Sequence, residues 1–179
     1  MNQLKIFKTF YIFSILFLGC NNYNSDPHNT DSTINGQYIE KNKDGLIKTI
    51  GNFKDGNRHG QFLYFDTKGK LQAQENYYDD QLHDEQITIH STGKINTKMV
   101  YKTGVKDGPY SKYYKTGKLQ ETGSYINDKK DGEVIWYYDS GTKNIVYTYK
   151  NGELNGPTKI YSKDGEIIEE GNYNKGIKE

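Results

Sequence analysis

The sequence predicts an all-β protein, an elongated single layer of antiparallel strands in which six hairpins of 24 residues follow one another as a meander of about twelve strands. Three observations predict this fold. The 179 residues include 17 tyrosines and 19 glycines, a composition that favours strands and turns. A 24-residue period runs without insertion or deletion from Gly36 to the end of the chain. Each period also contains two turn signals about twelve residues apart.

Residues 1–19 are expected to be a signal peptide. Two lysines and no acidic residue precede an apolar run from Phe10 to Leu18. This run is shorter than the roughly 20 residues that span a bilayer. Cys20, the single cysteine, follows directly, and the order resembles a bacterial lipoprotein signal, although Phe17 stands where Leu is usual. The resemblance implies cleavage before Cys20 and acylation of Cys20 as the new N-terminal residue. An ordinary secretory signal and an uncleaved anchor are the alternatives.

Residues 20–35 are expected to be the lipidated cysteine and a disordered tether, because this segment is polar and has no hydrophobic periodicity. The repeat domain is expected to occupy residues 36–179. Its six periods start at Gly36, Gly60, Asp84, Gly108, Gly132 and Gly156. Positions within a period are counted from 0 at these residues.

The first turn of each period ends in a glycine at position 9, which fits the left-handed residue that closes a three-residue hairpin loop. These glycines are Gly45, Gly69, Gly93, Gly117, Gly141 and Gly165. The second turn joins one period to the next and usually contains glycine at position 20. Asp80, Asp128 and Asp84 replace turn glycines, and aspartate is among the few other residues that tolerate positive φ.

Positions 5, 11 and 17 carry regular apolar or aromatic residues and are expected to share the better-buried face of the sheet. Even positions are expected on the other face. There the fourth and fifth periods place a cluster of large side chains, which we interpret as a partner-binding patch because tyrosine and tryptophan are enriched at interface hot spots. The patch consists of Tyr110, Tyr114, Val134, Trp136 and Tyr138. The alternative is that these rings only stabilise the sheet.

Composition and motifs argue against several other functions. A net charge of +1 provides no field to attract nucleic acid. One cysteine cannot build an internal disulfide or a cysteine-based zinc site. His59 and His83 end successive periods and are expected to lie two strands apart, too far to share a metal. No catalytic or phosphate-binding motif occurs, so we expect no enzyme, no cofactor and no bound metal.

The segment from Gly108 to Tyr125, GPYSKYYKTGKLQETGSY, resembles the bacterial variant of the MORN repeat, and the resemblance covers residues 36–179. The family includes proteins described as YwqK-type antitoxins. It implies a hairpin sheet that binds other proteins, sometimes lipids, and has no catalytic residues. With the lipoprotein-like signal, this predicts a monomeric scaffold tethered through Cys20 to a bacterial envelope membrane, in diderm bacteria the outer membrane. Neutralisation of a toxin by direct binding is the alternative, and direct lipid recognition by the repeats is a third possibility.

Overall fold

The computed structural model describes residues 34–179, which form one open antiparallel sheet of 16 strands. No helix occurs within these residues. Four strands have only two residues: β3 (Asn57–Arg58), β6 (Gln81–Leu82), β11 (Lys129–Lys130) and β16 (Ile177–Lys178). The long strands are β1 (Gly36–Lys41), β2 (Ile47–Lys54), β4 (Gly60–Phe65), β5 (Leu71–Tyr78), β7 (Asp84–Ile89), β8 (Ile95–Lys102), β9 (Val105–Tyr113), β10 (Leu119–Ile126), β12 (Gly132–Tyr137), β13 (Lys143–Lys150), β14 (Glu153–Tyr161) and β15 (Ile167–Asn174).

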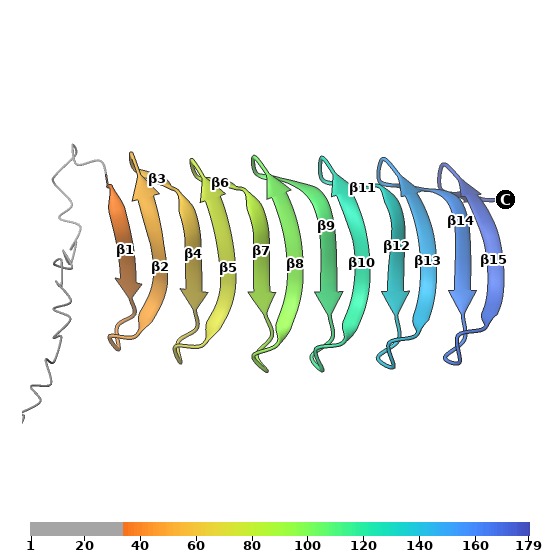
Figure 1. Ribbon diagram of the computed structural model, residues 1–179, viewed down its shortest axis with the longest axis horizontal. Coiled ribbons are helices and arrows are strands. Elements are labelled where there is room, and N and C mark those ends of the chain that lie inside the picture. Colours follow the sequence, from red (N-terminus) through yellow and green to blue (C-terminus); the bar gives the residue numbers. More distant parts are fainter. Residues whose placement is uncertain (1–33) are drawn as a thin grey trace, which may run out of the picture. The chain divides into compact units, whose positions relative to one another are not determined.

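The long strands are neighbours in the sheet in the same order as in the sequence, so the predicted meander of six hairpins is confirmed (Figure 1). The first strand begins at Gly36, where the 24-residue frame also begins. The predicted signal peptide, Cys20 and most of the predicted tether lie outside the described residues.

The loops at one end of the hairpins follow the predicted three-residue design. In the first loop, the N–H of Asn42 donates to the carbonyl of Leu46, and the N–H of Gly45 donates back to the carbonyl of Asn42. All six position-9 glycines have positive φ, between 76° and 97°. A side chain with a Cβ is disfavoured in this region, which explains the fixed glycine.

The turns at the other end have two residues, and both have positive φ, as in a type I′ hairpin turn. Asp80 and Asp128 have φ of 64°, and Asp84, which starts its period, has φ of 63°, so the predicted replacement of glycine is confirmed. Two of these aspartates also add a contact. The Oδ1 atoms of Asp80 and Asp128 accept hydrogen bonds from the backbone N–H groups of Arg58 and Lys106 in the preceding period, at 3.0 and 2.9 Å.

A register shift in every hairpin determines which residues share a face. In the second hairpin, Phe62 lies opposite Glu75, but after a shift between Tyr64 and Phe65 the pairing continues with Phe65 opposite Leu71. The second strand therefore contains one extra residue, a β-bulge. Because of it, position 17 lies on the same face as positions 2 and 4 and not with positions 5 and 11. The expectation that positions 5, 11 and 17 share the buried face is wrong.

The better-buried side, here called the packed face, carries positions 0, 2 and 4 of the first strand and 13, 15 and 17 of the second. Its buried apolar residues are Phe62, Tyr77, Met99, Tyr110 and Val134. The opposite side, the open face, carries positions 5 and 11, including Phe65, Leu71, Ile89, Ile95, Tyr113 and Leu119; these six side chains are half-buried or exposed. Val146 is the buried apolar residue of the open face.

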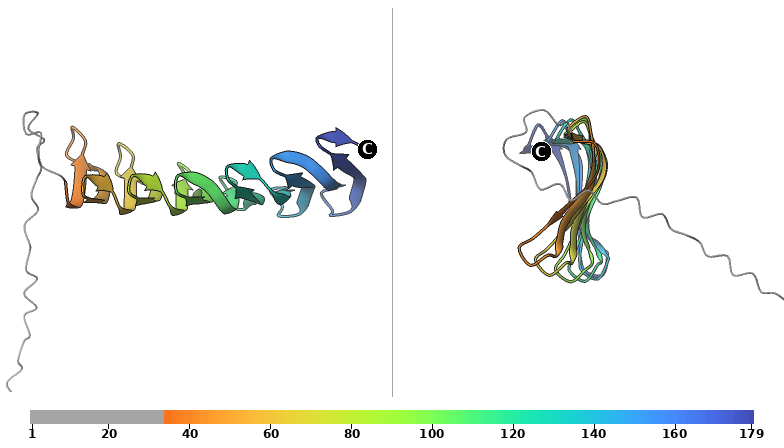
Figure 2. Two further views of the ribbon diagram at one scale, coloured as in Figure 1. Left: turned by 90° about the horizontal axis from the view of Figure 1, so that it is seen from above. Right: turned by 90° about the vertical axis from the view of Figure 1, so that its left-hand side faces the viewer.

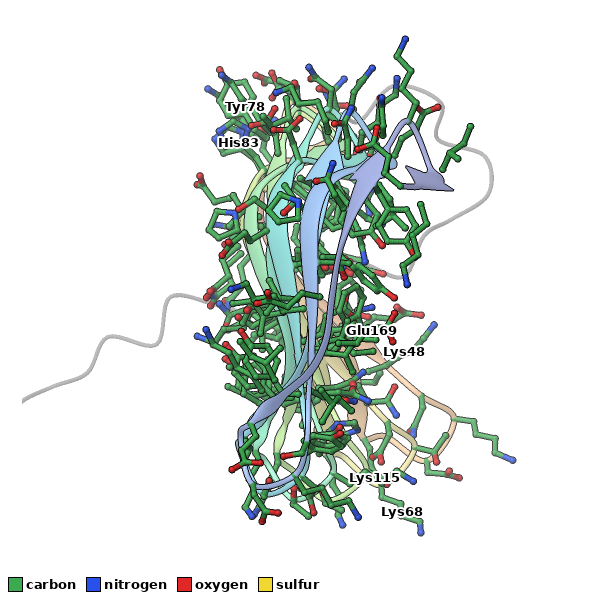
Figure 3. The ribbon with its side chains drawn as sticks, turned by 90° about the vertical axis from the view of Figure 1, so that its right-hand side faces the viewer. Lys48, Lys68, Tyr78, His83, Lys115 and Glu169 are labelled. Atoms are coloured by element: carbon green, nitrogen blue, oxygen red, sulfur yellow. The ribbon has the colours of Figure 1, made fainter. Side chains whose placement is uncertain are left out.

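Curvature explains why a single-layer sheet has a core. Seen along its length, the sheet is bent and not flat (Figure 2). Figure 3 shows Glu169 and Lys48 on the packed side and Tyr78 and His83 on the open side, and the strand ends beside the two-residue turns bend toward the packed side. Met99, Tyr110 and Val134 form the core cluster there, and four aromatic side chains pack against it: Tyr101, Tyr125, Trp136 and Tyr149.

Successive hairpins are joined by few backbone pairs. Between β2 and β4, two pairs are formed, Thr49 with Tyr64 and Ile50 with Leu63. The other junctions have two to five pairs. A single hairpin is marginal in water, so stability depends on the stacking of side chains across these junctions.

Candidate binding surfaces

A row of large side chains and glycines crosses the packed face at positions 2 and 15. Phe62 lies over Gly51, where a Cβ would collide with its ring. Tyr110 and Val134 flank Gly123 from the two neighbouring strands, and both come within 2.9 Å of the place where a Cβ would be. Each glycine therefore provides the space that its large neighbour fills, which is how aromatic residues protect glycines in sheets.

Glu121 is a buried charge in the middle of the packed face. Its side chain is 6% exposed and receives three hydrogen bonds, from the Tyr110 hydroxyl at 2.5 Å and from the ammonium groups of Lys112 and Lys130 at 2.8 Å each. Burial raises the pKa of Glu121, but the bonds from Lys112, Lys130 and Tyr110 outweigh this effect, and the net pKa is lowered. Burial and the bond to Glu121 raise the pKa of Tyr110.

Lys130 connects this ion cluster to the aromatic rings. Its ammonium group lies 5.0 Å from the ring centre of Trp136, 5.4 Å from that of Tyr149 and 5.7 Å from that of Tyr110. These distances fall within the range of cation–π attraction. Arg58, which occupies the position of Lys130 in the first period, makes a similar cation–π contact: its guanidinium lies 3.9 Å from the ring centre of Tyr77.

Two residues of the predicted patch are core residues. Tyr110 is 2% exposed and Val134 is fully buried, so neither offers surface to a partner. The physical reason is the curvature, because position 2 lies at the inside of the bend. Trp136 is half-buried, packs against the core cluster, and contacts Tyr147 edge to face at 5.7 Å between ring centres.

The two other patch residues, Tyr114 and Tyr138, hold neighbouring hairpins together. The Tyr114 hydroxyl donates to the carbonyl of Tyr137 at 2.6 Å, and the Tyr138 hydroxyl donates to the carbonyl of Tyr161 at 2.9 Å. His90, at the same position of the third period, contacts the carbonyl of Tyr113 in the same way. All five patch residues therefore have contacts within the sheet that account for their size.

The charged part of the packed face was not found by sequence reasoning. Glu121, Lys112 and Lys130 lie at positions 13, 4 and 22 of the fourth period, and only the bulge brings them together with Tyr110. The available signal was weak. Glu121 occupies position 13, where four other periods carry Thr49, Ala73, Thr97 and Ile145 but the sixth carries Glu169, so the residue type alone does not mark the cluster.

The open face carries an apolar stripe at positions 5 and 11. Paired residues on adjacent strands supply it. The pairs are Phe65 with Leu71, Ile89 with Ile95, Tyr113 with Leu119, and Tyr161 with Ile167. Lys143 opposite Tyr137 interrupts the stripe in the fifth period. Leu71 is 37% exposed and Ile167 48%, and no second layer of residues 34–179 covers them.

Histidines 59 and 83 lie on the open face beside the two-residue turns. The Tyr78 ring stands between them, with its centre 5.1 Å from that of His59 and 6.0 Å from that of His83 (Figure 3). Within residues 34–179, no group of three His, Cys, Asp or Glu side chains is placed to hold a metal ion. A search of the same residues finds no helix of the length and apolarity that a membrane span requires.

Comparison with known families gives four matches to one repeat model, described as MORN repeat variant. The matched segments are residues 58–79, 106–127, 130–151 and 154–175, which together make up slightly less than half of the chain. Each begins at position 22 and ends at position 19 of the next period, the first residue of the two-residue turn, so the matches follow the structural period. They support a MORN-repeat protein and its hairpin fold.

No curated protein matches the sequence. Among solved structures, one similar chain belongs to the "Crystal structure of GtfA/B complex bound to UDP and GlcNAc". It is 15% identical, with a TM-score of 0.27, and the alignment covers 63% of this chain and 24% of that chain. This likeness is too low to support an inference about fold or function.

Proposed function

We propose that the protein is a non-catalytic scaffold that binds another protein through its repeat sheet and is held on a bacterial envelope membrane by a lipidated Cys20. The observation that carries the binding role is the apolar stripe of the open face. Contiguous exposed apolar surface on a soluble domain commonly marks an interaction site. MORN-type repeats in four segments support a repeat-based scaffold.

The stripe fits a protein partner better than the predicted patch does. Tyr110 and Val134 are buried, whereas Tyr113, Leu119 and Leu71 are half-buried or exposed on a rigid sheet. Rigid apolar and aromatic side chains contribute contact area at low entropic cost. We retain Trp136 as a second contact, because its ring is the patch member that is partly open without a hydrogen bond to the next hairpin.

The binding role is tested by affinity capture from envelope extracts with three variants, each first shown by circular dichroism to keep the folded sheet. Tyr113→Ala combined with Leu119→Ala removes the centre of the stripe and is expected to reduce capture of a specific partner at least tenfold, the size of a typical hot-spot loss. Trp136→Ala reports on the packed face. Glu133→Ala, at an exposed open-face position away from the stripe, is the matched control and should capture as well as the wild type. Unchanged capture by the double variant would exclude the stripe.

The anchor is tested separately. Acyl chains contribute about 0.8 kcal/mol for each buried methylene, so two or three chains hold a domain stably on a membrane. We expect the wild-type chain to incorporate labelled fatty acid and to sediment with membranes. Cys20→Ser should lose both properties. Sedimentation of the Cys20→Ser chain with membranes would contradict a lipid anchor.

A toxin-neutralising role is the second candidate, favoured by the likeness of this chain to the repeats of YwqK-type antitoxins. It predicts that a neighbouring gene encodes a protein whose expression is toxic without this chain. Co-expression with the wild type should restore growth, and co-expression with the Tyr113→Ala and Leu119→Ala double variant should not. Growth that is unaffected by either gene would exclude this role.

A further inference from the structure

We propose that copies of this chain associate end to end, with the free edge of β15 pairing with β1 of a second copy and so extending the sheet across two molecules. Among the described residues, β1 pairs only with β2, and residues 167–171 of β15 pair only with β14. Unpaired edges present free N–H and C=O groups that a strand of another chain can bind.

The two edges have the register of an internal junction. Inside the sheet, the second strand of one hairpin pairs with the first strand of the next, positions 13 and 14 opposite positions 4 and 3. β15 is a second strand and β1 is a first strand. By the same rule, Glu169 lies opposite Glu40 of the second copy, Glu170 opposite Ile39, and Gly171 opposite Tyr38.

The side chains at these positions are complementary in size. Gly171 occupies position 15, where Gly51 and Gly123 are covered by Phe62 and Val134 of the next hairpin. Within residues 34–179 no further hairpin packs beyond β15, and the nearest atoms to a Cβ at Gly171 are the flexible Lys178 side chain at 3.2 Å and Thr158 at 3.4 Å. Tyr38 of a second copy has the position and size to cover Gly171 as Phe62 covers Gly51.

Exposed apolar residues are concentrated at the two ends of the sheet. Seven of the ten large apolar side chains that are most exposed belong to the first or the last hairpin or to the residues beside them. They are Ile34, Ile39, Leu46 and Ile47 at one end and Ile167, Ile168 and Ile177 at the other. Repeat proteins that remain monomeric usually end in repeats with polar outer sides. Each junction between two copies would remove one first-hairpin end and one last-hairpin end from water.

The charges at the junction are already neutralised. Glu40 forms an ion pair with Lys48 at 2.8 Å, and Glu169 pairs with Lys178, so the two opposed carboxylates each keep a lysine.

The C-terminal residues regulate access to the free edge of β15. Glu179 is bound by the side-chain amides of Asn172 and Asn174, and Ile177–Glu179 occupy the place that Ile34 and Asn35 of the second copy would take.

Engineered cysteines test the register directly. A chain with Cys20→Ser, Ile39→Cys and Glu170→Cys has its two thiols at opposite ends of one sheet, so a disulfide between these two positions joins two molecules. Mild oxidation of the purified full chain is expected to give dimers and longer ladders, because the interface does not close on itself. Two single-cysteine chains should form a mixed dimer and neither homodimer.

The control chain combines Ile39→Cys with Asp164→Cys. Asp164 is exposed at the same end of the sheet as Glu170 but does not lie opposite Ile39 in the proposed register. Equal cross-linking in this control, or homodimers of either single-cysteine chain, would overturn the proposal. So would cross-linking at background level. Because none of these residues lies in the open-face centre at Tyr113 and Leu119, failure here leaves the scaffold role intact.

A charge exchange tests the same pairing without cysteines. Ile39→Glu places a second carboxylate opposite Glu170 and is expected to weaken association at least tenfold in sedimentation velocity, since like charges directly opposite destabilise a strand pair. Glu170→Lys in the same chain should restore it. Glu179→Ala, which releases the C-terminal residues from Asn172 and Asn174 but keeps Lys178 beside Glu169, should strengthen association. Association that is unchanged by all three changes would refute the end-to-end geometry.

Discussion

Gly123 shows how single residues determine the packing of a single-layer sheet. In most strands, replacement of glycine by alanine stabilises a protein by roughly 0.4–1 kcal/mol, because the unfolded chain loses freedom. At Gly123 a Cβ would lie 2.9 Å from both Tyr110 and Val134, and overpacking costs about 1–3 kcal/mol. The steric term is the larger one. We therefore expect Gly123→Ala to lower the free energy of unfolding by about 1–2 kcal/mol in chemical denaturation.

Gly171→Ala is the matched control, at the same position of the sixth period. Its nearest neighbours are a flexible lysine and a threonine methyl group at 3.2 and 3.4 Å, and its φ is not positive. This substitution should change the free energy of unfolding by less than about 0.5 kcal/mol. Equal effects at both positions would contradict the account of the packed face.

Glu121 should make stability sensitive to acid. Its folded-state pKa is lowered, so the folded chain binds the proton less readily than the unfolded chain does. The contribution of this carboxylate to stability is therefore present above the ordinary glutamate pKa of 4.5 and is lost as the pH falls through the folded-state value. We expect Glu121→Gln to lower stability at pH 7 and to reduce the loss of stability between pH 6 and pH 3.

The comparison for Glu121→Gln is Glu40→Gln. The pKa of Glu40 is also lowered, first by its bond from Lys48, but the Glu40 side chain is 37% exposed, against 6% for Glu121. Water screens an exposed pair, so the pH profile of Glu40→Gln should differ less from that of the wild type. An acid-unfolding curve of Glu121→Gln that superimposes on the wild-type curve would show that the buried cluster is not the acid-sensitive element.

At the scale of the hairpin, the turn aspartates combine two roles that separate substitutions can distinguish. Asp128 holds positive φ and accepts the N–H of Lys106 from the preceding period. Asp128→Gly relieves the backbone strain of positive φ but loses the hydrogen-bond acceptor, so the free energy of unfolding should change by no more than about 0.5 kcal/mol. Asp128→Ala loses the acceptor and adds strain, and it should cost about 1–2 kcal/mol by urea unfolding. If Asp128→Ala lowered the free energy of unfolding less than Asp128→Gly does, this assignment of two roles to Asp128 would be contradicted.

The sequence allowed both turns of the hairpin to be predicted, because positive φ leaves a clear mark in residue choice. Gly45 and its equivalents, as well as Asp80 and Asp128, were identified from their positions alone. The faces were not predicted correctly. A bulge adds one residue without requiring glycine or proline, so the parity of the apolar pattern does not reveal that position 17 has changed sides.

The candidate partner-binding patch also depended on a feature that the local sequence does not reveal. Tyr110 and Val134 were identified as notable side chains, but burial depends on the curvature of the sheet, which no local pattern encodes. Tyr114 and Tyr138 were notable for the same reason, and their hydroxyls reach carbonyl groups 23 residues further along the chain. In the sequence, the repeat length is the feature that relates the two residues of such a pair. It identifies the partner only when the direction of the tyrosine side chain is already known.

At the scale of the whole sheet, stability is a sum over hairpins and the junctions between them. Each junction contains few backbone pairs, and the core cluster spans only neighbouring hairpins. This arrangement has no contact that requires all six hairpins at once. The described sheet should therefore tolerate the loss of one complete period but not of a fraction of one, since the fraction would shift every later side chain relative to its face.

Deletion of residues 84–107 tests this directly, because it joins His83 to Gly108 and keeps every later residue at its position in the period. We expect the shortened chain to keep a β-sheet circular-dichroism spectrum and to unfold with a denaturant slope lower by about one sixth, since the slope follows the surface exposed. Its stability should fall because Met99 leaves the core cluster. The control deletes residues 84–106, one residue fewer, and is expected to aggregate or unfold because the following strands lose their register. Equal folding of both deletions would show that the 24-residue period does not determine how the hairpins stack.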